Sequence, residues 1–247
     1  MILEICIDSV ESAINAEAGG ADRLELCASL EVGGITPGPG TIESVLANVT
    51  IPVNIMIRPR GGDFLYSNAE FEVMRRDIDF AREAGAAGIV LGILMPDGSV
   101  DFDRTAYLTE YASPIPVTFH RAFDMTDDPK QALEDIISAG TTRILTSGQC
   151  NSAFDGASLI GELVKLAGDR IIVMPGAGLN EENISDVARI TGASEFHLTG
   201  RSVAESGMLF RRPGISLGHP AMTDEEYLLK ISNIERIAKI KKLLSVN

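Results

Sequence analysis

Basic residues are scarce in this chain. Its 247 residues include 21 lysines and arginines against 35 aspartates and glutamates, which gives a net charge of -14. A field of that sign repels phosphate backbones and anionic lipid, so we expect neither nucleic acid nor a membrane as a partner. A small anionic ligand is still compatible with it, provided that a local group of basic side chains binds the anion.

Cysteine and long apolar runs are scarce as well. Cys6, Cys27 and Cys150 lie far apart and form no CxxC pair, which argues against a disulfide framework and against a zinc knuckle. The first eight residues carry Glu4 and Asp8 in an alternating pattern, unlike a signal peptide or a membrane span. We therefore expect a cytoplasmic protein, and 45% hydrophobic with 23% charged residues is typical of a globular domain.

The chain does contain a repeated unit, in which a short apolar run is followed by a segment with helical spacing. The expected strands are Ile2–Asp8, Arg23–Cys27, Val53–Arg58, Gly88–Ile93, Val117–Arg121, Arg143–Ser147, Ile171–Pro175 and Glu195–Thr199. The clearest helical segments are Ser9–Ala18, Asn68–Ala84, Pro129–Ala139 and Glu181–Thr191. Eight such units predict a single-domain (β/α)8 TIM barrel, a fold that takes about 250 residues.

The region after the eighth strand is longer than an ordinary connection. We expect the barrel core over 1–204, a lid or contact loop over 205–222 and a C-terminal helix over 223–247. Asp224–Leu244 has the apolar spacing of an amphipathic helix. That helix could cover the barrel or a second copy equally well, so a homo-oligomer is one expectation.

Alternation along the strands predicts a polar barrel interior, because successive side chains face opposite sides of a sheet. In the first strand the apolar side chains, which must face the helices, alternate with Glu4, Cys6 and Asp8. The expected interior is Glu4, Glu25, Asn54, Arg58, Thr118, His120, Arg143, Glu195 and His197. Buried charges need partners. We expect Glu4, Arg23, Arg143 and Glu195 to neutralise one another near the barrel floor.

Catalytic candidates lie at the strand ends, where TIM barrels carry their sites. His120 could act as a general acid or base with its pKa tuned by Glu25 and Arg58, or it could be a hydrogen-bonded core histidine. Arg58 precedes a glycine-containing loop that could clasp an anion. Asp124 either caps its loop or orients His120.

Glycine-containing loops after strands six to eight predict an anion site. Glycine lets backbone N–H groups approach an anion, and barrels often bind phosphate between the loops after strands seven and eight. The candidate residues are Ser147, Gly148, Gly176, Gly178, Gly200 and Arg201. The alternative is that Gly176 and Gly178 only make a tight turn.

Six motifs, in order and spacing, resemble the CutC family over Ile2 to about Gly218. They are Leu3-Glu-Ile-Cys-Ile-Asp-Ser9, Arg23-Leu-Glu-Leu-Cys27, Gly33-Gly-Ile-Thr-Pro-Gly38, Met56-Ile-Arg-Pro-Arg-Gly-Gly-Asp-Phe64, Thr118-Phe-His-Arg-Ala-Phe-Asp124 and Leu145-Thr-Ser-Gly148. The resemblance implies a TIM barrel, a cytoplasmic location and a role in copper homeostasis or copper binding. It does not imply a known reaction.

Copper can be tested against the residues, since Cu(I) prefers soft sulfur ligands. Cys6 and Cys27 have the same parity on adjacent strands, with Met56 on the third, and form a candidate Cu(I) site. The alternative is that both thiols are small hydrophobic core groups, and Cys150 on a loop is a bystander. A harder metal at His120 and His197 has no ligand spacing in its favour.

Two functions therefore stay open. One is a cytosolic protein that holds Cu(I) between Cys6 and Cys27. The other is an enzyme acting on a small anionic, phosphorylated or sugar-like metabolite, in which Glu25 and His120 exchange protons and Arg58 orients the substrate.

Overall fold

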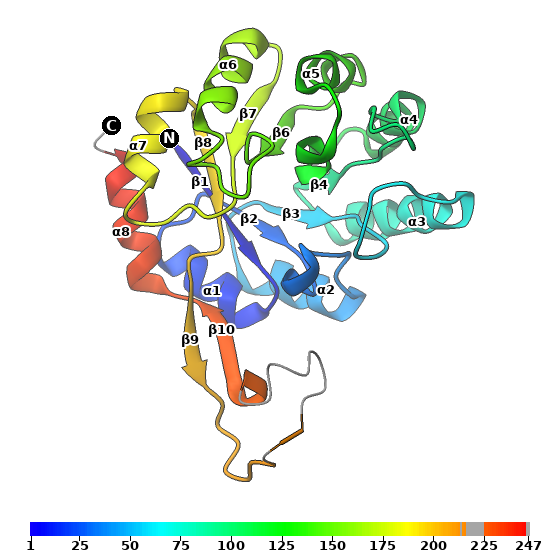
Figure 1. Ribbon diagram of the computed structural model, residues 1–247. Helices are drawn as coiled ribbons and strands as arrows, with labels where there is room; N and C mark the ends of the chain where they lie inside the picture. The colour runs from blue at the N-terminus through cyan, green and yellow to red at the C-terminus, as the bar shows by residue number, and fades with distance from the viewer. Residues whose placement is uncertain (213, 216–224, 246–247) are drawn as a thin grey trace.

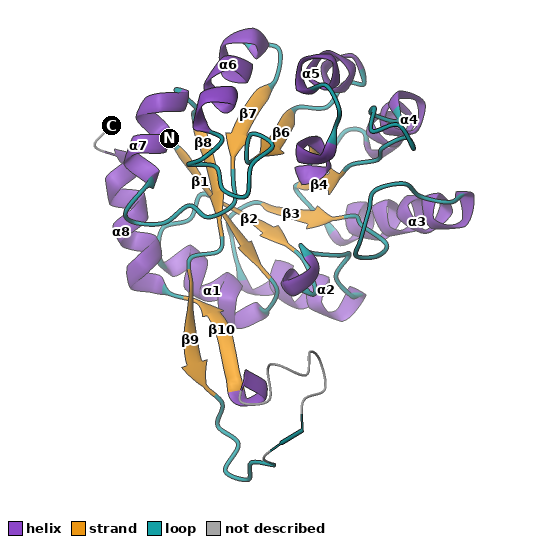
Figure 2. Ribbon diagram, viewed as in Figure 1, coloured by secondary structure: helices purple, strands orange, loops and turns teal. Residues whose placement is uncertain are grey.

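The computed structural model describes residues 1–212, 214–215 and 225–245. Eight parallel strands lie at its centre with helices around them (Figures 1 and 2). The barrel strands are β1 Ile2–Ile7, β2 Arg23–Leu26, β3 Val53–Met56, β4 Gly88–Leu91, β5 Val117–Phe119, β6 Arg143–Thr146, β7 Ile172–Pro175 and β8 Glu195–Leu198. The α-helices are α1 Val10–Ala18, α2 Pro39–Asn48, α3 Asn68–Ala84, α4 Phe102–Ala112, α5 Pro129–Ser138, α6 Ala157–Ala167, α7 Ile184–Thr191 and α8 Ile234–Ser245. Short 3-10 turns are η1 Leu30–Val32, η2 Arg121–Met125 and η4 Glu225–Tyr227.

The sheet closes into a barrel. Its strands follow the order β7-β6-β5-β4-β3-β2-β1-β8, all in parallel, and a parallel bridge between Gly176 and His197 joins the two ends. The predicted TIM barrel and all eight predicted strands are confirmed, with shifts of one or two residues at their ends. Among the helices that the structure describes, none combines the length and the apolar character needed to span a membrane.

Strand parity is as the sequence predicts. Leu3, Ile5 and Ile7 of β1 are fully buried in the apolar core between strands and helices. Inside the barrel, Cys6, Cys27, Met56 and Val90 form a separate small cluster. All nine polar residues expected in the interior are buried.

Local signals explain where the helices begin. Ser67 and Glu70 form a capping box at the start of α3, and Asp128 accepts backbone N–H bonds at the start of α5, before Pro129. The helix predicted from Glu181 starts three residues later, at Ile184. Before it, the Asn183 side chain binds the backbone of Gly178 and Asn180, and this turn delays the helix.

The segment after the barrel differs from its prediction. The helix expected from 223 begins only at Ile234, because Leu228–Ser232 forms a strand, β10, that pairs antiparallel with β9, Arg201–Glu205. Figure 1 shows these two strands extending away from the barrel as an arm, and α8 returning beside α1 and α7. Residues 213 and 216–224 of the expected lid and helix lie outside the described residues.

An ion network occupies the amino-terminal end of the barrel interior. Arg23 donates to Glu4 and Glu195, and Arg143 binds both carboxylate oxygens of Glu195, with Nε–Oε2 and Nη2–Oε1 distances of 2.6 and 3.1 Å. Asn54 donates to Glu4 as well. The predicted mutual neutralisation of these four charged residues is confirmed.

We expect Glu195→Gln to lower the free energy of unfolding by about 3 kcal/mol or more, since it leaves the buried Arg143 without its carboxylate partner. Glu134→Gln is the matched control, because it breaks a surface Arg–carboxylate pair with Arg170 and should lower the free energy of unfolding far less, since solvent screens an exposed pair. Urea unfolding of both variants measures the difference. If Glu195→Gln lowers the free energy of unfolding no more than Glu134→Gln does, the buried network does not stabilise the fold.

Candidate functional site

A cavity of about 260 Å³ lies at the carboxyl ends of the barrel strands. Its lining combines ionisable, sulfur and apolar side chains. They are Cys6, Glu25, Cys27, Val32, Gly33, Met56, Arg58, Phe64, His120, Arg121, Asp124, Met125, Leu145 and His197. The structure thus brings the predicted catalytic candidates and the predicted sulfur ligands to one place, at the barrel end that the fold favours for a site.

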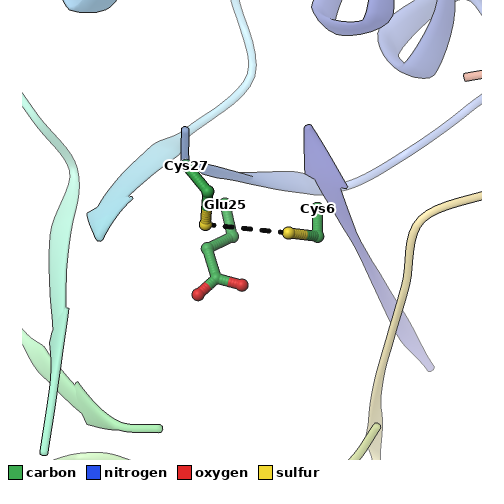
Figure 3. Close-up of side chains that lie close together, drawn as sticks. All are labelled: Cys6, Glu25 and Cys27. Carbon is green, nitrogen blue, oxygen red and sulfur yellow. Dashed lines mark hydrogen bonds between the residues drawn. The ribbon is translucent and has the colours of Figure 1, made fainter. Parts of the chain in front are cut away.

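The two sulfur atoms face each other across adjacent strands. Cys6 on β1 and Cys27 just after β2 point into the barrel with 3.8 Å between their Sγ atoms, and the Glu25 carboxyl group lies beside them (Figure 3). The hydrogen bond from Cys27 lowers the pKa of Cys6 to about 6, with help from His197 and against the effect of burial. The same hydrogen bond, together with burial, raises the pKa of Cys27 well above its usual value. The pair is therefore best described as a thiolate at Cys6 that accepts a hydrogen bond from the Cys27 thiol.

His197 connects the sulfur pair to the ion network at the barrel floor. Its Nδ1 lies 2.8 Å from Glu4 Oε1, and its Nε2 lies 3.3 Å from Glu25 Oε2. Burial alone would lower the pKa of His197, but Glu25, Cys6 and Glu4 raise it well above its usual value. Conversely, burial would raise the pKa of Glu4, but hydrogen bonds from His197 and Arg23 lower it to about 2. These contacts thus favour the protonated ring of His197 in spite of its burial.

Glu25 differs from Glu4, because its pKa is raised and not lowered. Burial, followed by the negative charge of Cys6, raises its pKa well above the usual value. Its Oε1 atom has no hydrogen-bond partner among the described residues. The alternation along the strand predicted that His197 is in the interior, but it did not predict the contacts of His197 with Glu4 and Glu25. Those contacts follow from the pairing of β8 with β1.

His120 is held as a neutral ring at the cavity wall. Its Nδ1 accepts the backbone N–H of Ala122 at 3.1 Å, and a Cβ at position 92 would lie 2.5 Å from that Nδ1, so Gly92 leaves room for the ring. Burial, with a smaller effect from the nearby Arg58 charge, lowers the pKa of His120 to about 3. Because Nδ1 is an acceptor, the ring proton is on Nε2. A neutral donor suits binding better than proton exchange near pH 7.

Arg58 is tied to loop carbonyls. Its guanidinium donates to the backbone oxygens of Val32, Gly34 and Gly62 at 2.7 to 2.8 Å and stacks on Phe64. These bonds hold the loops after β2 and β3 around the cavity. Its Nε alone is without a hydrogen-bond partner among the described residues.

Asp124 and Ser147 form a structural lock between two loops. The Asp124 carboxylate accepts from Thr146 Oγ1, the Ser147 N–H and hydroxyl, and Arg121. Of the two roles predicted for Asp124, loop capping is the one that the hydrogen bonds support, since none of those described joins it to His120. Gly148 donates its N–H to Thr146 Oγ1, so this part of the predicted anion cradle is already hydrogen-bonded.

The other glycines of the predicted cradle lie along the β7 and β8 loops. The Gly176 N–H donates to the Thr146 carbonyl, and Gly178 and Gly200 have positive φ angles of 68° and 56°. Arg201 pairs with Asp8, with Nη2 2.5 Å from Oδ2. None of these four residues lines the cavity described above. Anion binding there stays a prediction, separate from the cavity.

Two groups of described residues could hold a metal ion. One is Cys6, Glu25 and Cys27, and the other is Glu4, Glu25 and His197; within each group the potential ligand atoms lie within 4.8 Å of one another. His120 belongs to neither, so the structure does not support His120 and His197 as a common metal site. The first group has the two soft sulfur ligands expected for Cu(I).

Comparison with known proteins connects this site to a family. The family model of the CutC family matches residues 1–202. The chain is 47% identical over 242 residues to the copper homeostasis protein cutC homolog of Homo sapiens, covering 98% of this chain and 88% of the human one. A crystal structure from Streptococcus agalactiae that bears the name of the copper homeostasis protein CutC superposes with a TM-score of 0.76 and 33% identity, covering 81% of this chain and 98% of the other.

More distant solved structures share the fold alone. Phosphoribosyl anthranilate isomerase from Thermotoga maritima superposes with a TM-score of 0.58 at 13% identity, and the match covers 100% of both chains. At that identity the likeness supports the barrel and carries no inference about chemistry.

We expect the rings of His120 and His197 to differ in charge over the whole range from pH 5 to 8. His120 should stay neutral with the proton on Nε2, because burial and Arg58 lower its pKa to about 3, whereas His197 should stay protonated because Glu25 and Glu4 raise its pKa. Imidazole ¹⁵N chemical shifts over that range measure both charges. Two rings that titrate together near pH 6.5 would contradict this electrostatic description.

Proposed function

The chain belongs to the CutC family, and from that premise we propose that it binds Cu(I) as a cargo ion in copper homeostasis, with Cys6 and Cys27 as ligands. The observation that carries this proposal is the pair of buried sulfur atoms 3.8 Å apart at the wall of a cavity. The human relative and the Streptococcus agalactiae structure both bear a copper-homeostasis name.

The distance between the sulfur atoms suits a shared ion. Metal–thiolate bonds of about 2.3 Å, the value for zinc, allow two sulfurs on one ion to lie up to about 4.6 Å apart. The 3.8 Å between Cys6 and Cys27 is within that limit, so a metal can join them with little backbone movement. The thiolate is the form that binds metal, and the lowered pKa of Cys6 favours it at neutral pH.

The surroundings favour a soft monovalent ion. Met56 and Val90 pack with the two cysteines, which gives an apolar, polarisable environment and a thioether sulfur within the same cluster. Soft sulfur donors select Cu(I) over harder cations. The raised pKa of His197 favours its charged form, whose positive charge lowers the pKa of the Cys6 thiol beside it.

The proposed location of the protein is the cytoplasm. Cys6, Cys27 and Cys150 form no disulfide, which suits the reducing cytoplasm.

Self-association stays a prediction. Its expected surface is β9 and the residues that follow it, where Val203, Leu209 and Phe210 are exposed.

We expect the Cys6→Ser, Cys27→Ser double variant to lose Cu(I) affinity by on the order of 100-fold or more, since both sulfur ligands are gone. Cys150→Ser is the control and should bind as the unaltered protein does, because only the backbone carbonyl of Cys150 is used in the loop lock. An anaerobic competition titration against a chromophoric Cu(I) chelator measures all three. A double variant that competes as well as the unaltered protein would overturn the proposal.

Cu(I) affinity should rise with pH. Above a pKa of about 6 Cys6 is already a thiolate, whereas the raised pKa of Cys27 keeps that group protonated, so binding to both sulfurs releases one proton. Between roughly pH 7 and 9 the affinity should therefore increase about tenfold per pH unit, and below pH 6 more steeply. The same titration, corrected for the chelator's own protonation, gives the slope. A flat profile would contradict two-thiolate binding.

A further inference from the structure

Three polar atoms on the cavity residues lack partners. Arg58 Nε, His120 Nε2 and Glu25 Oε1 are buried, and none has a hydrogen-bond partner among the described residues. All three residues line the same cavity. A buried polar group left unpaired costs about 1 to 3 kcal/mol. Three of them around one cavity indicate a ligand with complementary polar atoms.

The Arg58 charge strengthens this indication. Arg58 is only 4% exposed, and no described carboxylate lies within ion-pair distance of it. Its hydrogen-bond partners are three carbonyls, and the Tyr66 hydroxyl that interacts with it is neutral as well. Arg60 in the same loop, by contrast, pairs with Asp63 and Glu70. A buried guanidinium without an anion is unfavourable. An anion in the cavity would supply the charge partner that Arg58 lacks.

His120 contributes a second donor beside Arg58. Its Nδ1 accepts from Ala122, which leaves the proton on Nε2. The two side chains pack on the same ring: the Arg58 guanidinium carbon lies 4.9 Å from the Phe64 centroid, and the His120 ring centroid lies 5.0 Å from it. Phe64 thus contacts both the charged Arg58 and the neutral His120, and all three residues line the cavity.

We propose that this cavity binds a small organic carboxylate, whose oxygens accept from Arg58 Nε and His120 Nε2, and whose hydroxyl or carbonyl group meets Glu25. This goes beyond Cu(I) binding and does not rest on it. The volume of about 260 Å³ is below the roughly 300–1,000 Å³ of pockets for drug-sized ligands, which limits the ligand to a short acid. The contact with Glu25 makes it a 2-hydroxy or 2-oxo acid. Met56, Met125 and Leu145 provide apolar wall for its carbon chain.

The donor set favours a carboxylate over a phosphate. Arg121 also lines the cavity, but its guanidinium donates to Asp124 and Ser147. The N–H groups of Arg58 Nε and His120 Nε2 match the two oxygens of a planar carboxylate, whereas phosphate sites use more donors, typically several backbone N–H groups or a helix N-terminus. The glycine loops after β7 and β8 that could supply such groups do not line this cavity.

The test is isothermal titration of the metal-free full chain with pyruvate, L-lactate, L-malate and 2-oxoglutarate, in a buffer without carboxylate or phosphate. At least one acid should bind one-to-one, and its amide (lactamide for lactate) should bind about tenfold more weakly or worse, because charge-assisted hydrogen bonds contribute about 1.5 to 3 kcal/mol. Failure of all four acids, or tighter binding of inorganic phosphate than of any acid, would overturn the proposal.

Variants then locate the binding. His120→Asn can still accept the Ala122 N–H but has no donor at the Nε2 position, and Arg58→Met removes the charge; each should weaken binding about tenfold or more. Arg60→Met is the matched control from the same loop and should bind normally. Circular dichroism checks that the variants fold, since Arg58 also ties two loops. A folded His120→Asn variant with unchanged affinity would refute the site even if Arg58→Met fails to fold.

Discussion

Charge inside the barrel is the constraint on which the rest of this structure depends. Glu4 is its centre: one oxygen accepts from Arg23 and Asn54, and the other faces His197. Arg23 continues the network through Glu195 to Arg143. Because each buried charge needs an opposite one, the network fixes which protonation state each member can hold. Through His197 it also reaches the sulfur pair, where it favours a thiolate at Cys6. The ion network at the amino-terminal end of the barrel therefore influences the protonation of the sulfur pair at the carboxyl-terminal end.

The two ends of the interior differ in how completely their polar groups are paired. At the floor, Arg143 and Glu195 meet through two hydrogen bonds, and the arrangement serves stability. At the mouth, Arg58, His120 and Glu25 each retain one unpaired buried atom next to the cysteines. Polar groups left unpaired in a folded protein are unfavourable unless a ligand completes them. The sulfur pair is suited to a soft metal ion, whereas the unpaired groups are suited to hydrogen bonds with a polar ligand. The residues of both sets line the same cavity.

Strand parity made much of this site predictable. Side chains alternate along a strand, so Cys6, Glu25 and His120 could be assigned to the interior from the sequence. What parity cannot supply is the partner of each group. The contact of His197 with Glu4 joins residues far apart in the chain and depends on β8 closing against β1. Similarly, three loop carbonyls use most of the Arg58 donors, and Asp124 turns to the β6 loop instead of His120.

The helix expected at 223–247 shows the same limit for local structure. Residues 228–232 fit a helical apolar spacing as well as a strand, and only their pairing with β9 decides between the two.

Cu(I) binding by the sulfur pair is tested most directly by X-ray absorption at the copper edge of the Cu(I)-loaded Cys150→Ser protein. A first coordination shell with two sulfur atoms from Cys6 and Cys27, lost in the double serine variant, is the predicted result. A shell of nitrogen and oxygen atoms without sulfur would contradict the account.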